Sequence, residues 1–237
     1  MQRIAVTGAS GLIGSALVGK LKSEGYTVQR LVRRPTVSSE EVFWNPATQE
    51  IDIAALEGVD AVIHLAGAGV GDKRWTKKYK AEILNSRLLG TTTIANAVAQ
   101  VKPKVFITSS AIGWYGETGN RAVTETDRGG DDFLAAVCRE WEAAADLAGD
   151  VRTVKIRTGL VLDPTGGALG RMLPLFRFGL GGKLGNGKQW WSWITLHDQL
   201  RAIQFLLENN EISGPVNLTA PNPVTNQEFT SALARAL

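Results

Sequence analysis

The sequence predicts an α/β fold in which a doubly wound parallel sheet carries a smaller C-terminal lobe. Apolar, β-rich runs alternate with helical patterns through residues 1–165. These runs are apolar on both faces, which is typical of strands covered by helices on both sides of a parallel sheet. From about Gly166 the alternation gives way to the glycine-rich run FGLGGKLGNG. The end of the strand–helix alternation predicts a second, smaller unit in residues 166–237.

The order of the expected elements supports this plan. Strands are expected at IAVT, TVQRLV, DAVIHLA, KVFITSS, RTVKIRTGLVL and PVNLTA. Helices are expected over 12–23 and 75–99, from 131 onward, over 195–208, and from 225 onward. Thr195 with Asp198 and Thr225 with Glu228 resemble capping boxes that start the last two helices. The chain ends inside the last of these, so we expect the lobe to be truncated at its C-terminus.

Composition narrows the class of protein. The net charge of +3 over 237 residues gives only weak support for a polyanionic partner. A single cysteine excludes an internal disulfide and fits a reducing compartment. The N-terminus lacks the apolar core of a signal peptide, and no apolar run approaches the length of a membrane span. We therefore expect a cytoplasmic, soluble protein without a membrane partner.

The segment VTGASGLIG places Gly8, Gly11 and Gly14 between the first strand and the first helix. Glycine lets the backbone turn tightly and approach a pyrophosphate, while the helix N-terminus offers free N–H groups and a positive dipole. Ser10, Leu12 and Ile13 complete this loop and first helical turn, and we count them among the cofactor-binding residues. A plain tight turn is the alternative. The position between strand and helix favours a Rossmann-type dinucleotide site.

The residues after the second strand predict which dinucleotide binds. An acid is expected there when the ligand is NAD, because it would hold the ribose 2′-hydroxyl. Arg33 and Arg34 stand there instead. A guanidinium would pair with a 2′-phosphate, which favours NADP, although an ordinary basic loop is the alternative. Residues 1–165 are therefore predicted to be an NADP-binding Rossmann domain, and residues 166–237 a substrate-side lobe interleaved with the sheet.

Several motifs together resemble one enzyme family. VTGASGLIG, DAVIHLAG, SSAIGWYG and the WITLHD segment resemble the extended short-chain dehydrogenase/reductases, the NAD(P)-dependent epimerase/dehydratase family. The motifs Arg74-Trp75, Ser86-Arg87, CREWE (138–142), RTGLVL (157–162) and GGKLGNGKQ (181–189) resemble its atypical, epimerase-like branch of unknown substrate. The resemblance implies a nucleotide-binding oxidoreductase or epimerase.

The resemblance also implies further cofactor-binding residues. Glu82 and Arg87 match positions linked with the cofactor in the atypical branch, although a plain intrahelical pair is the alternative. Leu65, Ala66 and Val161 match positions that would flank the two ends of the cofactor. We count Gly67 and Ser109 among the cofactor-binding residues as well.

The usual catalytic triad of the parent family is missing. Its Ser or Thr position is Ala111, and its Tyr and Lys positions are Leu134 and Cys138. No tyrosine of this chain has a lysine four residues later. Leu134, Val137, Cys138, Trp141 and Ala145 instead form an apolar stripe at helical spacing, which indicates core packing.

Two hypotheses on function remain. The first is an NADP-dependent oxidoreductase or epimerase-like enzyme whose catalytic groups are Tyr115 and Ser110, with Glu82 and Glu125 as further candidates. The second is a catalytically silent NADP(H)-binding regulatory protein, for example one linked to cell division. The basic run 72–80 and His64 are interpreted as a solvated helix start and a packed strand residue. We expect a small-molecule substrate, no metal and no nucleic acid, with a homodimer left open.

Overall fold

The computed structural model describes residues 2–237, and one eight-stranded sheet forms its centre. Its strands are, in chain order, β1 (Arg3–Thr7), β2 (Thr27–Val32), β3 (Glu41–Asn45), β4 (Glu50–Ile51), β5 (Ala61–His64), β6 (Val105–Ala111), β7 (Thr153–Thr158) and β11 (Gly214–Leu218). In space they follow the order β11-β7-β6-β5-β1-β2-β3-β4. Neighbours pair in parallel apart from β3 and β4. The predicted doubly wound parallel sheet is confirmed.

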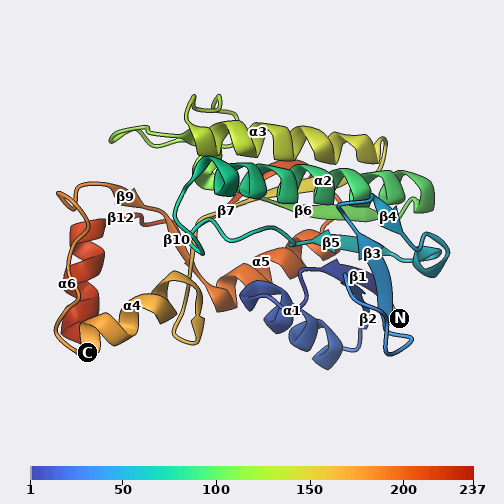
Figure 1. Cartoon of the computed structure of the whole chain (residues 1–237), viewed down its shortest axis with the longest axis horizontal. Coiled ribbons are helices and arrows are strands. Elements are labelled where there is room, and N and C mark those ends of the chain that lie inside the picture. Colours follow the sequence, from blue (N-terminus) through green and yellow to red (C-terminus); the bar gives the residue numbers. More distant parts are fainter. Residues whose placement is uncertain (1) are drawn as a thin grey trace.

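Helices cover both faces of this sheet. The helices α2 (Lys77–Val101) and α3 (Phe133–Ala145) lie side by side on one face, and α1 (Leu12–Ser23) and α5 (Leu196–Glu208) cover the other (Figure 1). Side chains that alternate along each strand feed two separate cores. In β1, Ile4 and Val6 pack with the residues of α1 and α5, whereas Ala5 packs with those of α2. This two-sided burial is why the strands read as continuous apolar runs.

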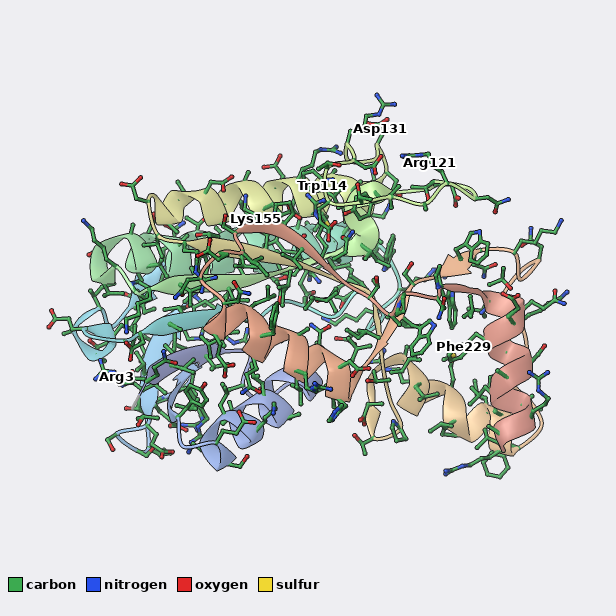
Figure 2. The ribbon with its side chains drawn as sticks, turned by 180° about the vertical axis from the view of Figure 1, so that it is seen from behind. Arg3, Trp114, Arg121, Asp131, Lys155 and Phe229 are labelled. Atoms are coloured by element: carbon green, nitrogen blue, oxygen red, sulfur yellow. The ribbon has the colours of Figure 1, made fainter. Side chains whose placement is uncertain are left out.

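The remaining elements gather at one end of the sheet. There α4 (Gly167–Arg177), β9 (Trp190–Trp191), β12 (Val224–Thr225) and α6 (Asn226–Ala236) form a small lobe (Figure 1). The rings of Trp191 and Phe229 lie 5.0 Å apart inside it, and Figure 2 shows Phe229 on α6. Between these elements the chain returns to the main body through α5 and β11. Residues 166–237 therefore contribute both to the lobe and to the layers of the sheet.

Several elements differ from the sequence expectation. RTVKIRTGLVL forms two strands, because the chain leaves the main sheet at Gly159 and β8 (Leu160–Asp163) pairs with β10 (Trp193–Thr195). A Cβ on Gly159 would lie 2.6 Å from the carbonyl oxygen of Ser192, so the close crossing requires glycine. The helix α4 was not expected, because two glycines and Pro174 mask its helical pattern.

Of the two capping boxes expected from the sequence, one is complete and the other is half formed. Thr225 and Glu228 form a complete capping box, in which each side chain accepts from the other residue's backbone N–H. At α5 only half of the exchange is made, since Thr195 accepts from Asp198 N–H and donates its hydroxyl to the Asp198 carboxylate. The long helix α2 begins two residues later than expected, after its N-cap Thr76.

A substitution at Phe106 tests how much the core between the sheet and the helices α2 and α3 contributes to stability. Its side chain is fully buried, and Phe106→Ala should lower the free energy of unfolding by about 3–5 kcal/mol in urea titrations. Phe178→Ala is the matched control, because its ring is 80% exposed and the loss should stay within about 0.5 kcal/mol. Equal losses for the two variants would contradict this assignment of the core.

Candidate functional site

The glycine turn between β1 and α1 is the most constrained part of the structure. Gly8 has φ +68°, and a Cβ there would lie 2.8 Å from the carbonyl carbon of Leu65. A Cβ on Gly14 would overlap the carbonyl oxygen of Gly8. Gly11 makes no such close contact and is the N-cap of α1, whose first turn contains no acidic residue. Two glycines thus shape the turn, and the third leaves the helix N-terminus open to an anion.

A buried hydrogen-bond network holds the wall against which Gly8 packs. Thr7 Oγ1 accepts the backbone N–H groups of Leu65 (3.1 Å) and Ala66 (3.3 Å). With both lone pairs used, the Thr7 hydroxyl donates to His64 Nδ1, 2.7 Å away. His64 is fully buried, and burial lowers its pKa to about 3. The interpretation of His64 as a packed strand residue is therefore confirmed, and its role is to fix the end of β5.

A pocket of about 1210 Å³ opens in front of this turn, at the carboxyl ends of β1, β2 and β5. Its volume suits a large ligand such as a dinucleotide. Nine of the residues predicted to bind the cofactor line it, namely Gly8, Ser10, Gly11, Arg33, Arg34, Leu65, Ala66, Gly67 and Glu82. Sequence reasoning missed several other lining residues, among them Trp44, Tyr79 and Asn85.

Six predicted cofactor residues lie outside the lining of this pocket, and packing explains the position of three of them. Ile13 and Val161 pack against the core under α1 and α5. Leu12 packs under the Gly166-Gly167 turn that starts α4, where Cβ atoms would lie 3.1 Å from its methyl groups. The remaining three are Gly14, Arg87 and Ser109.

The two arginines after β2 differ in their environment. Arg34 forms a bidentate pair with Glu41, with N–O distances of 2.6 and 2.8 Å. The Glu41 side chain is fully buried, and the hydrogen bonds from Arg34 and from Val37 N–H hold its pKa near 2. Arg33 is exposed and makes no hydrogen bond or ion pair with any residue in the described range. Arg33 is thus the guanidinium that remains available to a ligand.

Glu82 and Arg87 do not pair with each other. Glu82 binds Lys73 at 3.1 Å, at the edge of the pocket. Arg87 donates from Nη1 to the carbonyl oxygens of Ala68 (2.9 Å) and Ile83 (3.1 Å), and it stacks on Trp141. No carboxylate within residues 2–237 neutralises it, and burial lowers its pKa. The alternative of a plain intrahelical pair is excluded, and Arg87 stays a charged group beside Gly67.

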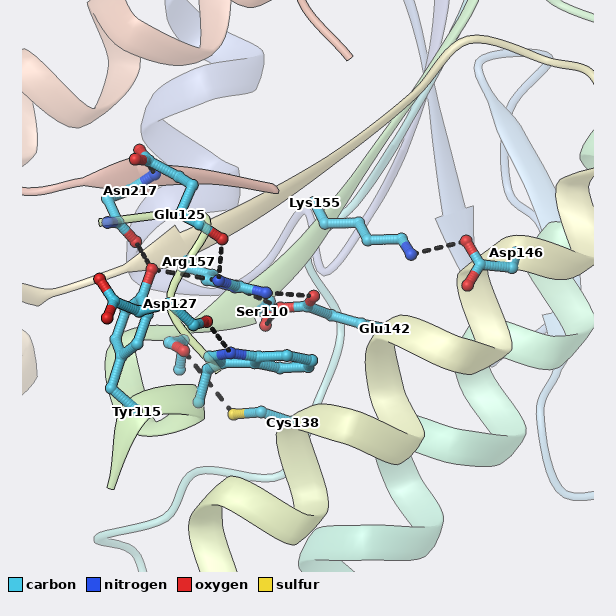
Figure 3. A network of polar contacts seen from close by, with 12 residues as sticks. Ser110, Tyr115, Glu125, Asp127, Cys138, Glu142, Asp146, Lys155, Arg157 and Asn217 are labelled. Atoms are coloured by element: carbon cyan, nitrogen blue, oxygen red, sulfur yellow. Dashed lines mark hydrogen bonds and ion pairs between the residues drawn. The ribbon is translucent and has the colours of Figure 1, made fainter. Parts of the chain in front are cut away.

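The predicted catalytic groups Tyr115 and Ser110 lie in a buried network, not at the mouth of the site (Figure 3). The Tyr115 hydroxyl donates to Asn217 Oδ1 at 2.7 Å and accepts from Arg157 Nη1 at 3.1 Å. Ser110 Oγ donates to Glu142 Oε1 at 2.6 Å. Both hydroxyls hydrogen-bond to a buried charged pair, and neither lines the pocket.

That charged pair joins α3 to β7. Arg157 binds Glu142 through Nε (2.8 Å) and Nη2 (2.9 Å), and both side chains are nearly inaccessible to solvent. Arg157 also stacks on the Trp114 ring at 4.0 Å. Sequence reasoning identified both residues as parts of motifs but did not predict that they meet. The positions of the two motifs in the sequence do not indicate how far apart Glu142 and Arg157 lie in the folded protein.

The face of α3 that lacks the tyrosine and lysine packs against the turn η2 (Ile112–Tyr115). The side chains of Leu134 and Cys138 lie beside Gly113. Burial raises the pKa of the Cys138 thiol to about 11, with a smaller contribution from the Glu142 charge. Val137, Cys138, Trp141 and Ala145 are buried and Leu134 is half-buried. The predicted core packing of this stripe is confirmed, and the thiol is protonated at neutral pH.

Hydrogen bonds from Arg171 and Trp190 connect the main body with the lobe. Arg171 on α4 donates to the Asp72 carboxylate (2.6 Å) and to the Gly71 carbonyl oxygen (2.8 Å) in the loop after β5. Trp190 Nε1 donates to Asn120 Oδ1 at 2.8 Å. Asn120 belongs to the projecting segment that carries Arg121, which Figure 2 shows extending toward the lobe.

Two further classes of site find no support within residues 2–237. No three His, Cys, Asp or Glu side chains gather there in an arrangement that could hold a metal ion. No helix there is long and apolar enough to cross a membrane.

His64 makes the stability of the protein depend on pH. Its folded pKa of about 3 lies below the ordinary value of 6.5, so the unfolded chain binds one more proton between these values. Stability should therefore fall by about 2 kcal/mol from this group when the pH is lowered from 7.5 to 5. Urea titrations should show a smaller fall in His64→Gln and an unchanged one in the exposed control His197→Gln. An identical fall in all three proteins would show that His64 does not titrate in this way.

The burial of the Arg157–Glu142 pair predicts that variants of buried and exposed ion pairs lose different amounts of unfolding free energy. Glu142→Gln leaves the Arg157 charge without its counterion and should cost about 3–5 kcal/mol of unfolding free energy. Asp146→Asn is the control, since the Asp146–Lys155 pair joins the C-cap residue of α3 to β7 at 2.6 Å but its carboxylate is 67% exposed. It should cost at most about 1 kcal/mol. Similar costs at the two positions would contradict a special role for the buried pair.

The chain is similar to proteins of one family over nearly its whole length. The model of the NAD dependent epimerase/dehydratase family matches residues 4–218. An epimerase family protein of Mycobacterium leprae is 46% identical over 99% of this chain and 77% of its own length.

Two solved structures agree with this family assignment. Human epimerase family protein SDR39U1 (isoform 2), solved with NADPH, is 35% identical with a TM-score of 0.88 over 98% of this chain and 80% of its own. A nucleoside-diphosphate sugar epimerase of Corynebacterium glutamicum is 38% identical with a TM-score of 0.86, over 99% of this chain and 50% of its own. The resemblance to the atypical, epimerase-like branch is confirmed. The chain belongs to the NAD-dependent epimerase/dehydratase family.

Proposed function

We propose that this protein binds NADP(H) and uses it in an oxidoreductase or epimerase-like reaction on a small molecule. The observation that carries the proposal is the unpaired Arg33 at the rim of the pocket, next to an Arg34 that Glu41 already neutralises. A cation without an internal partner suits the 2′-phosphate that distinguishes NADP from NAD. The NADPH in the solved structure of the human relative supports the same choice.

Several features of the pocket support this proposal. The turn at Gly8 and Gly14 excludes side chains, and the open N-terminus of α1 would hold the pyrophosphate through backbone N–H groups. Leu65, Ala66 and Gly67 would line its path across the end of β5. Arg87, whose charge lacks a carboxylate partner, lies beside Gly67 and would face an electron-rich part of the ligand.

The nicotinamide would supply the hydride chemistry. The protein would then have to orient the substrate and donate a proton to it or accept one from it. The thiol of Cys138 is excluded from this work because it is buried and protonated. Of the four candidate acid–base groups, Tyr115, Ser110 and Glu125 are held in the buried network. Glu82 is the one that lines the pocket, and its only ion-pair partner in the described chain is the exposed Lys73. We propose Glu82 as the acid–base group.

Removing the Arg33 guanidinium should change cofactor preference. Arg33→Gln should weaken NADPH binding by about 1.5–3 kcal/mol, the range of a hydrogen bond to a charged group, and leave NADH binding unchanged. Fluorescence titrations with both nucleotides measure this, with Arg201→Gln as the control because Arg201 is exposed on α5 outside the pocket. Equal losses for NADPH and NADH, or none for either, would refute 2′-phosphate recognition by Arg33.

A further inference from the structure

A third arginine, Arg30, lines the same pocket from inside strand β2. It pairs with Val6 of β1 on one side and with Glu41 of β3 on the other. Val28, two residues earlier, packs in the core under α1, so Arg30 lies on the face of the sheet that α1 covers. This is the face on which the glycine turn leads into α1.

The guanidinium of Arg30 is only partly satisfied. Its Nη2 donates to Glu41 Oε1 at 2.9 Å. Neither Nε nor Nη1 has a hydrogen-bond partner among residues 2–237; Nε is buried, whereas the side chain as a whole is 38% exposed and lines the pocket, so Nη1 is the donor within reach of a ligand. A buried donor without an acceptor is rare in a folded protein and calls for a ligand or water to complete it.

Glu41 cannot supply the missing acceptor. Its two oxygens already accept from Arg30, from both terminal nitrogens of Arg34 and from Val37 N–H. Its side chain is fully buried between the two arginines. The rim of the pocket therefore carries three guanidinium groups and one carboxylate, an excess of two positive charges. A phosphate monoester carries about −1.5 to −2 charges at neutral pH and three acceptor oxygens.

We infer that Arg30 is a second residue that recognises the 2′-phosphate, together with Arg33, and that Glu41 positions it. This inference rests on the proposed NADP(H) function. Arg33 reaches the phosphate from the loop after β2, and Arg30 contributes the donor that Glu41 leaves unused. Glu41 keeps the arginines from repelling one another while the site is empty of ligand, so the site is organised before the phosphate arrives.

Adenosine 2′,5′-bisphosphate and 5′-AMP are the probes, because they differ only in the 2′-phosphate. Calorimetric titration of the full chain should show that wild type prefers the bisphosphate. Arg30→Gln should weaken bisphosphate binding about tenfold, as one lost charge-assisted hydrogen bond would, and leave 5′-AMP binding unchanged. Arg201→Gln should match wild type for both probes.

Arg30→Lys tests whether the donor geometry matters. A lysine can keep the ion pair with Glu41 and preserve the fold, but its single ammonium lacks the planar fork that can bind Glu41 and a phosphate side by side. We expect it to bind the bisphosphate as weakly as Arg30→Gln does. Full affinity in Arg30→Lys would overturn the role of the guanidinium fork, and it decides the matter if Arg30→Gln fails to fold.

The outcomes separate this inference from the function on which it rests. If Arg33→Gln loses bisphosphate affinity but Arg30→Gln does not, Arg30 is not a phosphate ligand and the NADP(H) function stands. An equal loss for both probes in Arg30→Gln would also overturn the inference, since it would reflect the shape of the pocket. If wild type binds the two probes equally, the proposed preference for NADP itself fails.

Discussion

The buried pair between Arg157 and Glu142 is the interaction on which the arrangement of the other polar groups depends. Two charges removed from water are tolerated only when their remaining hydrogen-bonding groups are satisfied. Ser110 and Tyr115 provide that satisfaction, and Arg157 also donates to the carbonyl oxygen of Glu125. Tyr115 in turn binds Asn217, whose backbone N–H donates to the Glu125 carboxylate. One pair thus ties β6, β7, β11, α3 and the projecting loop together (Figure 3).

This network explains why Tyr115 and Ser110 do not line the pocket. Hydroxyls near the end of β6, which could face a substrate, are turned inward to serve Arg157 and Glu142. The adjoining face of α3 carries Leu134 and Cys138, which pack on Gly113. The polar groups that remain available to a ligand lie instead around the glycine turn and the ends of β2 and β5. Recognition of a nucleotide is therefore better developed in this structure than any proton-transfer site.

The features that could be predicted from the sequence are those carried by local patterns. The glycine turn could be located because backbone conformation and close packing leave glycine as the residue that fits. The strands could be located because each is buried on both faces. Arg33 and Arg34 are indistinguishable in the sequence, since what separates them is Glu41 on the next strand. The strand β3 that carries Glu41 was not expected at all.

The position of Tyr115 shows the same limit over a longer range. Its motif correctly places it after β6, but its burial depends on Arg157, 42 residues away, and on Asn217, 102 residues away. No local pattern encodes which hydroxyl a buried charge will recruit. Whether a tyrosine is exposed or buried therefore depends on residues that are distant in the chain.

The two halves of the pocket differ in how readily they can change over evolutionary time. The part around Gly8 and Gly14 is built from main-chain atoms, so nearly every substitution there would distort the turn itself. The charged rim is built from side chains, and Arg33 and Arg34 are exposed at the end of a strand. Exposed side chains can be exchanged with little effect on folding. Descendants of one ancestor can therefore keep the same dinucleotide-binding turn. Single substitutions in the segment 30–34 can then change which of the cell's two nicotinamide cofactors the turn serves.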